Sequence, residues 1–153
     1  MAGTRIKKYI VLHYSMTARD RTTFAAVDRY HKEKWNFKSS LGHYIGYHYF
    51  IDGKGVITQG RADEESGAHC KEQGKNFDSI GICLAGNFDT ETPSAKQLAS
   101  LKTLIIGLMK KHKIPFANLK FHRDYAKYKS CPGNNIKPDF YKVLLAVPAN
   151  KVK

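Results

Sequence analysis

The stretch DSIGICLAGNF (residues 78–88) decides the fold class, because its centre is an apolar run that contains no charged side chain. A short run of this kind is typical of a strand that is covered on both faces. The stretch therefore predicts a buried strand in a sheet that has other layers packed above and below it.

Further strand patterns lie on both sides of this stretch. YIVLH (residues 9–13) is a short apolar run rich in β-branched residues, and NLKFH (residues 118–122) is another short candidate. Between them, the runs YIGYHYFI (44–51) and VITQGR (56–61) are joined by DGKG, where aspartate and glycine permit the tight connection of a β-hairpin.

Three segments predict helices. RTTFAAVDRYHKEKW (21–35) spaces its apolar residues three or four positions apart, and KPDFYKVLLAV (137–147) predicts a short final helix. The longest helix is predicted in ETPSAKQLASLKTLIIGLMKKHK (91–113). It is expected to start with Thr92 as N-cap and Pro93 at the first helical position, and to end in a lysine-rich turn. Strands interleaved with helices indicate an α/β sheet sandwiched by helices, in one domain over residues 1–153.

The composition bounds the partners and the compartment. With 26 Lys and Arg against 13 Asp and Glu, the formal charge is +13, which attracts polyanions such as nucleic acid, acidic cell-wall polymers or lipopolysaccharide. Neither a leader pattern nor a bilayer-spanning apolar run is evident, so we expect a protein held in a cytoplasm. Three cysteines in such a compartment predict free thiols rather than a disulfide framework.

Two histidines and one cysteine form a candidate metal set. His13 ends the first expected strand, His122 ends a later one, and Cys131 follows on a loop in FHRDYAKYKSCPG (121–133). Catalytic zinc sites keep three protein ligands of these types and leave a fourth position for water. The spacing of His122 and Cys131 is no short zinc signature, so the residues by themselves leave open a basic loop with a structural thiol.

Five segments, taken in order, resemble a known family. VLHYS, GYHYFI with DGKGVITQGR, GAHC with NFDSIGICLAGNFD, TPSAKQLASLKTLI and FHRDYAKYKSCPG resemble the zinc-dependent N-acetylmuramoyl-L-alanine amidases. That family shares its fold with the peptidoglycan recognition proteins and includes the short phage lysozymes of the T7 type. The resemblance implies a central mixed sheet of about five strands flanked by helices, with a core over about residues 9–145 and no separate wall-binding domain.

The resemblance also implies roles for individual residues. Tyr47 and Lys129 match the catalytic pair of the T7-type enzymes, and His69 matches a histidine that lines the cleft and binds substrate. The implied ligands of Zn²⁺ are the three residues already singled out, His13, His122 and Cys131. The stretch HCKEQGKN (69–76) is longer than in the T7-type relatives, which leaves the rim of the cleft there undefined.

These residue types suit the hydrolysis of an unactivated amide. Zinc lowers the pKa of a bound water towards about 7, which provides a nucleophile at neutral pH. A lysine ammonium stabilises the oxyanion, typically by about 2–4 kcal/mol when it is preorganised. A tyrosine hydroxyl can position the water, move its proton or bond the oxyanion, and the sequence does not separate these roles.

The remaining histidines and cysteines are expected to be structural. His48 alternates with Tyr47 along a strand, so it should point away from the cleft. Cys83 lies inside the apolar run and Cys70 follows the cleft histidine, and both are expected as free structural thiols. Three further histidines are expected at the surface, namely His31, His43 and His112.

The resemblance leads us to expect a peptidoglycan hydrolase that cleaves the amide between the lactyl group of N-acetylmuramic acid and the L-alanine of the stem peptide. We expect a monomeric phage endolysin, made in the host cytoplasm, that reaches the periplasmic peptidoglycan on lysis and whose charge favours contact with the anionic envelope. Two alternatives stay open: a non-catalytic peptidoglycan-binding protein of the same fold, and a cytoplasmic amidase that recycles muropeptides. A nucleic-acid or polymerase partner is not favoured, because no basic stripe with interleaved aromatics stands out.

Overall fold

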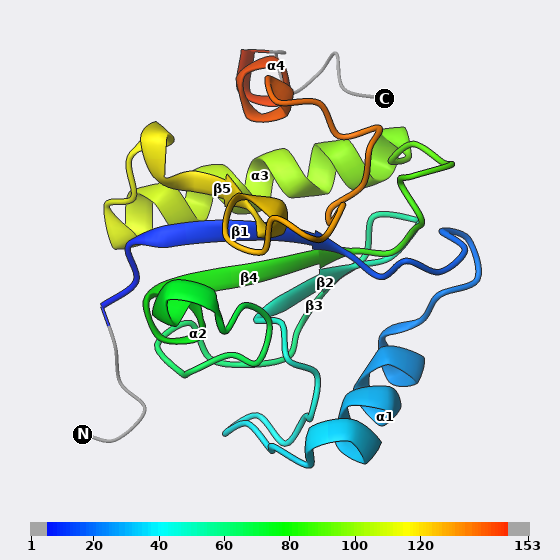
Figure 1. Cartoon of the computed structure of the whole chain (residues 1–153), viewed down its shortest axis with the longest axis vertical. Helices are drawn as coiled ribbons and strands as arrows, with labels where there is room; N and C mark the ends of the chain where they lie inside the picture. Colours follow the sequence, from blue (N-terminus) through cyan, green and yellow to red (C-terminus); the bar gives the residue numbers. More distant parts are fainter. Residues whose placement is uncertain (1–5, 147–153) are drawn as a thin grey trace.

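The computed structural model describes residues 6–146 as an α/β fold built on one mixed sheet (Figure 1). Its five strands are β1 (Tyr9–Tyr14), β2 (Tyr49–Ile51), β3 (Ile57–Gln59), β4 (Ser79–Leu84) and β5 (Leu119–Phe121). They lie in the order β3-β2-β4-β1-β5, with β2, β4, β1 and β5 parallel and β3 antiparallel to β2. The predicted fold class, including the hairpin between β2 and β3, is confirmed.

Helices cover both faces of this sheet. The α-helices are α1 (Phe24–Trp35), α2 (Lys75–Asp78), α3 (Ala95–His112) and α4 (Phe140–Ala146). Short 3-10 helices are η1 (Glu72–Gly74), η2 (Phe116–Asn118) and η3 (His122–Asp124). In Figure 1, α3 and α4 lie on one side of the sheet, and α1 and α2 lie on the other. Within the described residues, no helix has the length and apolarity needed to cross a bilayer.

The central strand β4 separates two apolar cores. All of its residues are buried, as the apolar run predicts. Successive side chains of a strand point to opposite faces, and here Ile80, Ile82 and Leu84 pack with α3, whereas Cys83 packs with Phe50 and the α1 side. The face towards α3 therefore holds the larger core, and the opposite face is free to carry polar groups.

Helix α3 begins later than predicted. Its N-cap is Ser94 rather than Thr92, because Ser94 and Gln97 form a capping box in which each backbone N–H donates to the other side chain at 3.0 Å. Pro93 therefore precedes the cap instead of opening the helix. Gln97 also donates to the Ala85 carbonyl at 2.8 Å, which anchors the start of the helix to the end of β4.

The register of the sheet places two histidines at one edge. β1 and β5 are parallel neighbours, with Leu12 paired to Phe121. The next residue along each strand direction is a histidine, His13 on β1 and His122 at the start of η3. Since carboxyl ends of parallel strands meet at the same edge, these two side chains lie next to each other.

Candidate metal centre

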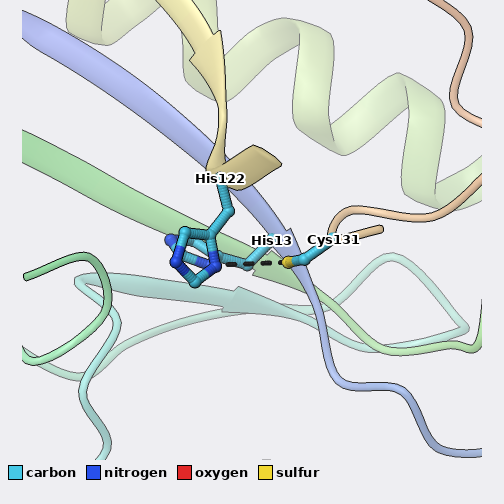
Figure 2. Close-up of side chains that lie close together, drawn as sticks. All are labelled: His13, His122 and Cys131. Atoms are coloured by element: carbon cyan, nitrogen blue, oxygen red, sulfur yellow. Dashed lines mark hydrogen bonds between the residues drawn. The ribbon is translucent and has the colours of Figure 1, made fainter. Parts of the chain in front are cut away.

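Three side chains converge at the carboxyl edge of the sheet. The donor atoms of His13, His122 and Cys131 all lie within 4.8 Å of one another, and all three residues are buried. The ring centroids of the two histidines are 4.5 Å apart, and Cys131 Sγ lies 3.7 Å from His13 Nδ1. Figure 2 shows the two rings and the thiol pointing toward one another.

Backbone and side-chain hydrogen bonds bring the Cys131 loop back to the strand ends. The Arg123 N–H donates to the Cys131 carbonyl at 2.9 Å, directly beside the start of η3. One residue earlier, the Ser130 hydroxyl donates to Asp89 at 3.0 Å, and the Tyr14 hydroxyl at the end of β1 donates to the same carboxylate at 2.8 Å. The loop is therefore tied to β1 and to the segment after β4.

The geometry and chemistry of these donors fit zinc. With Zn–S near 2.3 Å and Zn–N near 2.0–2.1 Å, a tetrahedral site separates sulfur and nitrogen ligands by about 3.6 Å. The 3.7 Å between Cys131 Sγ and His13 Nδ1 matches that value. Two imidazoles and one thiolate are also a ligand set that zinc favours, and three protein ligands leave one coordination position for a small molecule.

A chain of hydrogen bonds fixes the orientation of His13. The Ser79 hydroxyl donates to the Lys75 carbonyl at 2.5 Å, so its oxygen is left to accept from His69 Nε2 at 3.2 Å. With its proton on Nε2, His69 must accept through Nδ1, which lies 2.8 Å from His13 Nε2. His13 then carries its proton on Nε2, and its Nδ1 lone pair points to the metal position.

His69 is buried next to His13. Its residue is 7% exposed, and both ring nitrogens have protein partners. The ring packs directly on β4, where a Cβ at Gly81 would lie 2.6 Å from His69 Cγ, so a glycine is required at that position of the strand. The structure places His69 behind His13, as its orienting partner.

The environment keeps the two histidine ligands unprotonated and the cysteine ligand protonated in the absence of a metal. Burial, and then the charge of His69, lowers the pKa of His13 well below its usual value, and burial followed by Lys129 lowers the pKa of His122. Both imidazoles are therefore neutral at neutral pH and can donate a lone pair. Burial raises the pKa of Cys131 to about 12, so a bound metal would replace the thiol proton.

Tyr47 lies beside the donor cluster. Its ring centroid is 5.0 Å from that of His13, although the residue precedes β2 instead of lying within a strand as expected. Burial raises the pKa of Tyr47 well above its usual value, so the hydroxyl stays protonated and can donate a hydrogen bond. His48, the next residue, is fully buried and bonded to Gly81 and Glu65, which confirms the expectation that it faces away.

Lys129 lies on the loop between His122 and Cys131, and its residue is exposed. Its ammonium is close enough to depress the pKa values of His13, His122 and Cys131. The ammonium therefore adds positive charge at the mouth of the cluster and is accessible to a bound molecule.

The expectation that His31 lies at the surface is wrong. The residue is 5% exposed, its Nδ1 accepts the Gly46 N–H at 2.8 Å, and its ring lies 5.5 Å from that of Tyr47. The helix spacing that places it one turn after Val27, on the face of α1 that packs against the core, is the signal that was available. His43 is partly exposed, and His112 is partly covered through its 2.9 Å contact with Asp63.

Glu72 and Tyr128 lie near the proposed metal ligands, and no sequence motif marks either of them. Glu72, in η1, places Oε1 3.7 Å from His122 Nε2 and accepts through Oε2 from Tyr128 at 2.9 Å. The unusual length of the stretch 69–76 is the one sequence feature that marks this place.

Cys70, Cys83 and Cys131 are all free thiols, as expected.

Residues 2–134 match the N-acetylmuramoyl-L-alanine amidase family. The chain belongs to this family. Among individual relatives of this chain, the endolysin of Escherichia phage T7 is 35% identical over 100 residues, which cover 61% of this chain and 62% of the endolysin. Peptidoglycan-recognition protein SC2 of Drosophila melanogaster is 29% identical over 129 residues, covering 84% and 69% of the two chains.

Solved structures agree with the family assignment. The N-acetylmuramoyl-L-alanine amidase LysC from Clostridium intestinale superposes with a TM-score of 0.77 at 32% identity, covering 94% of this chain and 88% of LysC. Drosophila PGRP-LB superposes with a TM-score of 0.70 at 27% identity, covering 97% and 84% of the two chains. The likeness therefore extends to both enzymes and peptidoglycan recognition proteins.

Proposed function

We propose that this protein is a zinc-dependent amidase that hydrolyses the bond between the lactyl group of N-acetylmuramic acid and the L-alanine of the peptidoglycan stem peptide. The observation that carries the proposal is the convergence of two neutral imidazoles and a thiol on one point, with His13 Nδ1 presented by an ordered chain of hydrogen bonds. Membership of the amidase family supports the choice of reaction.

The residues present assign a role to each part of the site. His13, His122 and Cys131 would hold zinc, which when bound supplies a Lewis acid that activates water and polarises a carbonyl group. Tyr47, whose ring lies 5.0 Å from that of His13, keeps its hydroxyl proton and could donate it to a substrate oxygen at the centre. The exposed ammonium of Lys129 opposes the negative charge that develops on the carbonyl oxygen.

Metal content and activity of one variant test the proposal. We expect about one zinc per chain and release of free stem peptide from muropeptides by the wild type. Cys131→Ser should lose both, because a hydroxyl is a much poorer zinc ligand than a thiolate. Cys83→Ala is the matched control for zinc content, since Cys83 is also a buried free thiol but lies outside the cluster. Full hydrolysis by Cys131→Ser would show that the ligand assignment is wrong.

We also propose that the amidase acts as an endolysin, a role supported by its similarity to the T7 and T3 phage endolysins. Initial rates on intact sacculi and on soluble anhydro-muropeptides distinguish this role from recycling. An endolysin should hydrolyse both, with efficient release from sacculi. Activity confined to soluble fragments would favour the recycling amidase, and binding without hydrolysis would favour a recognition protein.

A further inference from the structure

The carboxylate of Glu72 lies between a proposed metal ligand and the loop that carries Lys129. Oε1 is 3.7 Å from His122 Nε2, and Oε2 accepts from the Tyr128 hydroxyl at 2.9 Å. The Glu72 side chain is 20% exposed and that of His122 is 9% exposed, so the pair is only partly screened by water. One carboxylate therefore contacts both η3, where the ligand sits, and the loop beyond it.

The position of Glu72 mirrors that of His69 on the other histidine. His13 turns Nε2 to His69 and keeps Nδ1 for the metal. His122 turns Nε2 to Glu72, which leaves its Nδ1 on the side of His13 and Cys131. Ligand histidines generally direct the second ring nitrogen to a carboxylate, carbonyl or water, which fixes the tautomer and raises the affinity of the metal.

We propose that Glu72 is a positioning residue for the metal site, acting through His122. At 3.7 Å the present contact between the neutral ring and the carboxylate is longer than a hydrogen bond. A metal on Nδ1 draws electron density from the ring and makes the Nε2–H more acidic, which strengthens its attraction to the carboxylate. The negative charge also offsets the nearby Lys129 ammonium, which otherwise opposes positive charge at this ligand.

A competing role for Glu72 is direct metal binding. Cys70, Glu72 and His122 also offer donor atoms within 4.8 Å of one another, and Cys70 Sγ lies 3.8 Å from Glu72 Oε1. In that role His122 would bridge two metals, which requires loss of its last ring proton. A positioning role lets His122 keep this proton and is therefore favoured. The two roles also differ in the number of metal ions bound per chain.

This inference rests on the proposed zinc site, and its test measures zinc binding rather than activity. Glu72→Gln removes the charge but keeps an acceptor for Tyr128, and Glu64→Gln is a control with the same charge change at an exposed site. Competition with a chromophoric chelator should show zinc affinity about 10–100-fold weaker in Glu72→Gln and unchanged in Glu64→Gln. Glu72→Asp should recover part of the loss, and ¹⁵N spectra should show a shifted His122 Nε2 signal only in the Glu72 variants.

Each outcome decides between the roles. One zinc per chain, weakened in Glu72→Gln, supports the positioning role. Wild-type affinity in Glu72→Gln overturns it, as would two zinc ions per chain with the second lost in both Glu72→Gln and Cys70→Ser. A wild type that binds no zinc would instead overturn the proposed metal centre, and this inference with it.

Discussion

The two histidines of the proposed metal centre are supported in different ways. His13 lies on β1 and is backed by His69 and Ser79, a group that we call the buried half of the site. All three of these residues are buried, and the chain of hydrogen bonds ends on the backbone carbonyl of Lys75. The orientation of His13 is therefore fixed by the sheet itself.

His122 belongs to what we call the open half, together with Glu72 and Tyr128. Its outer partner, Glu72, is 3.7 Å away and partly exposed, and Tyr128 is 74% exposed. The loop that follows carries the exposed Lys129. The difference teaches that the outer ring nitrogen of His13 faces a buried group, whereas that of His122 faces a partly exposed carboxylate.

The largest expected effect is a loss of turnover when Lys129, on the loop beside the open half, is substituted. Lys129→Gln should lower kcat about 100- to 1000-fold, because removing one preorganised charge-stabilising donor typically has that cost. Zinc affinity should not weaken, since Lys129 is not among the donors and its charge opposes a cation. Steady-state kinetics on muropeptides and chelator competition measure the two quantities.

Lys127→Gln is the matched control for this change, because Lys127 is an exposed lysine on the same loop. It should keep wild-type turnover. Equal losses in both variants would show that Lys129 contributes only to the general positive charge of the loop.

The next effect separates the two halves by stability. His69→Leu removes the acceptor of the buried His13 Nε2–H, so the free energy of unfolding of the metal-free protein should fall by about 1–3 kcal/mol. Zinc affinity should fall about 10–100-fold as well. Urea unfolding and chelator competition test both. Glu72→Gln should weaken zinc binding alone, because its carboxylate is partly exposed.

Ser79→Ala tests the same chain of hydrogen bonds, one bond further from the proposed metal position than His69. Because the Ser79 hydroxyl contacts His69 rather than a ligand, its effect on zinc affinity should be smaller than that of His69→Leu. Equal destabilisation of the metal-free protein by His69→Leu and Glu72→Gln would contradict the distinction between a buried and an open half.

The last expected effect is a pH dependence of folding, to which His31 and His48 contribute from outside both halves. Burial lowers the pKa of His31 to about 4 and that of His48 to about 3, against about 6.5 in an unfolded chain. Between pH 6.5 and 4 the unfolded state therefore binds more protons, so stability falls as the pH falls. Urea midpoints of the metal-free protein should show a loss of about 1 kcal/mol per pH unit per histidine.

His31→Gln keeps an acceptor for the Gly46 N–H but does not titrate, so it should reduce the slope by the contribution of one histidine. The slope should persist in Glu72→Gln and Lys129→Gln, whose substitutions lie elsewhere. Stability that is constant between pH 7 and 5 in the wild type would contradict the burial of neutral histidines at these positions.

Much of the fold followed from local patterns, and the failures have identifiable causes. The apolar run of β4 and the Asp-Gly turn of the hairpin are local signals, and both elements occur where they are predicted. The prediction of Thr92 as the N-cap of α3 was wrong because Ser94 forms reciprocal hydrogen bonds with Gln97. His31 was predicted at the surface because its side chain is polar, although its spacing from Val27 puts it on the face of α1 that packs against the core.

The sequence by itself determined the central strand and the placement of His13 and His122 at strand ends. Parallel strands bring such residues to one edge whatever the intervening loops do. Only the tertiary structure decided that His69 turns behind His13, that the loop returns Cys131 to the same point, and that Glu72 faces His122. Those directions depend on hydrogen bonds between segments far apart in the chain, which no local pattern encodes.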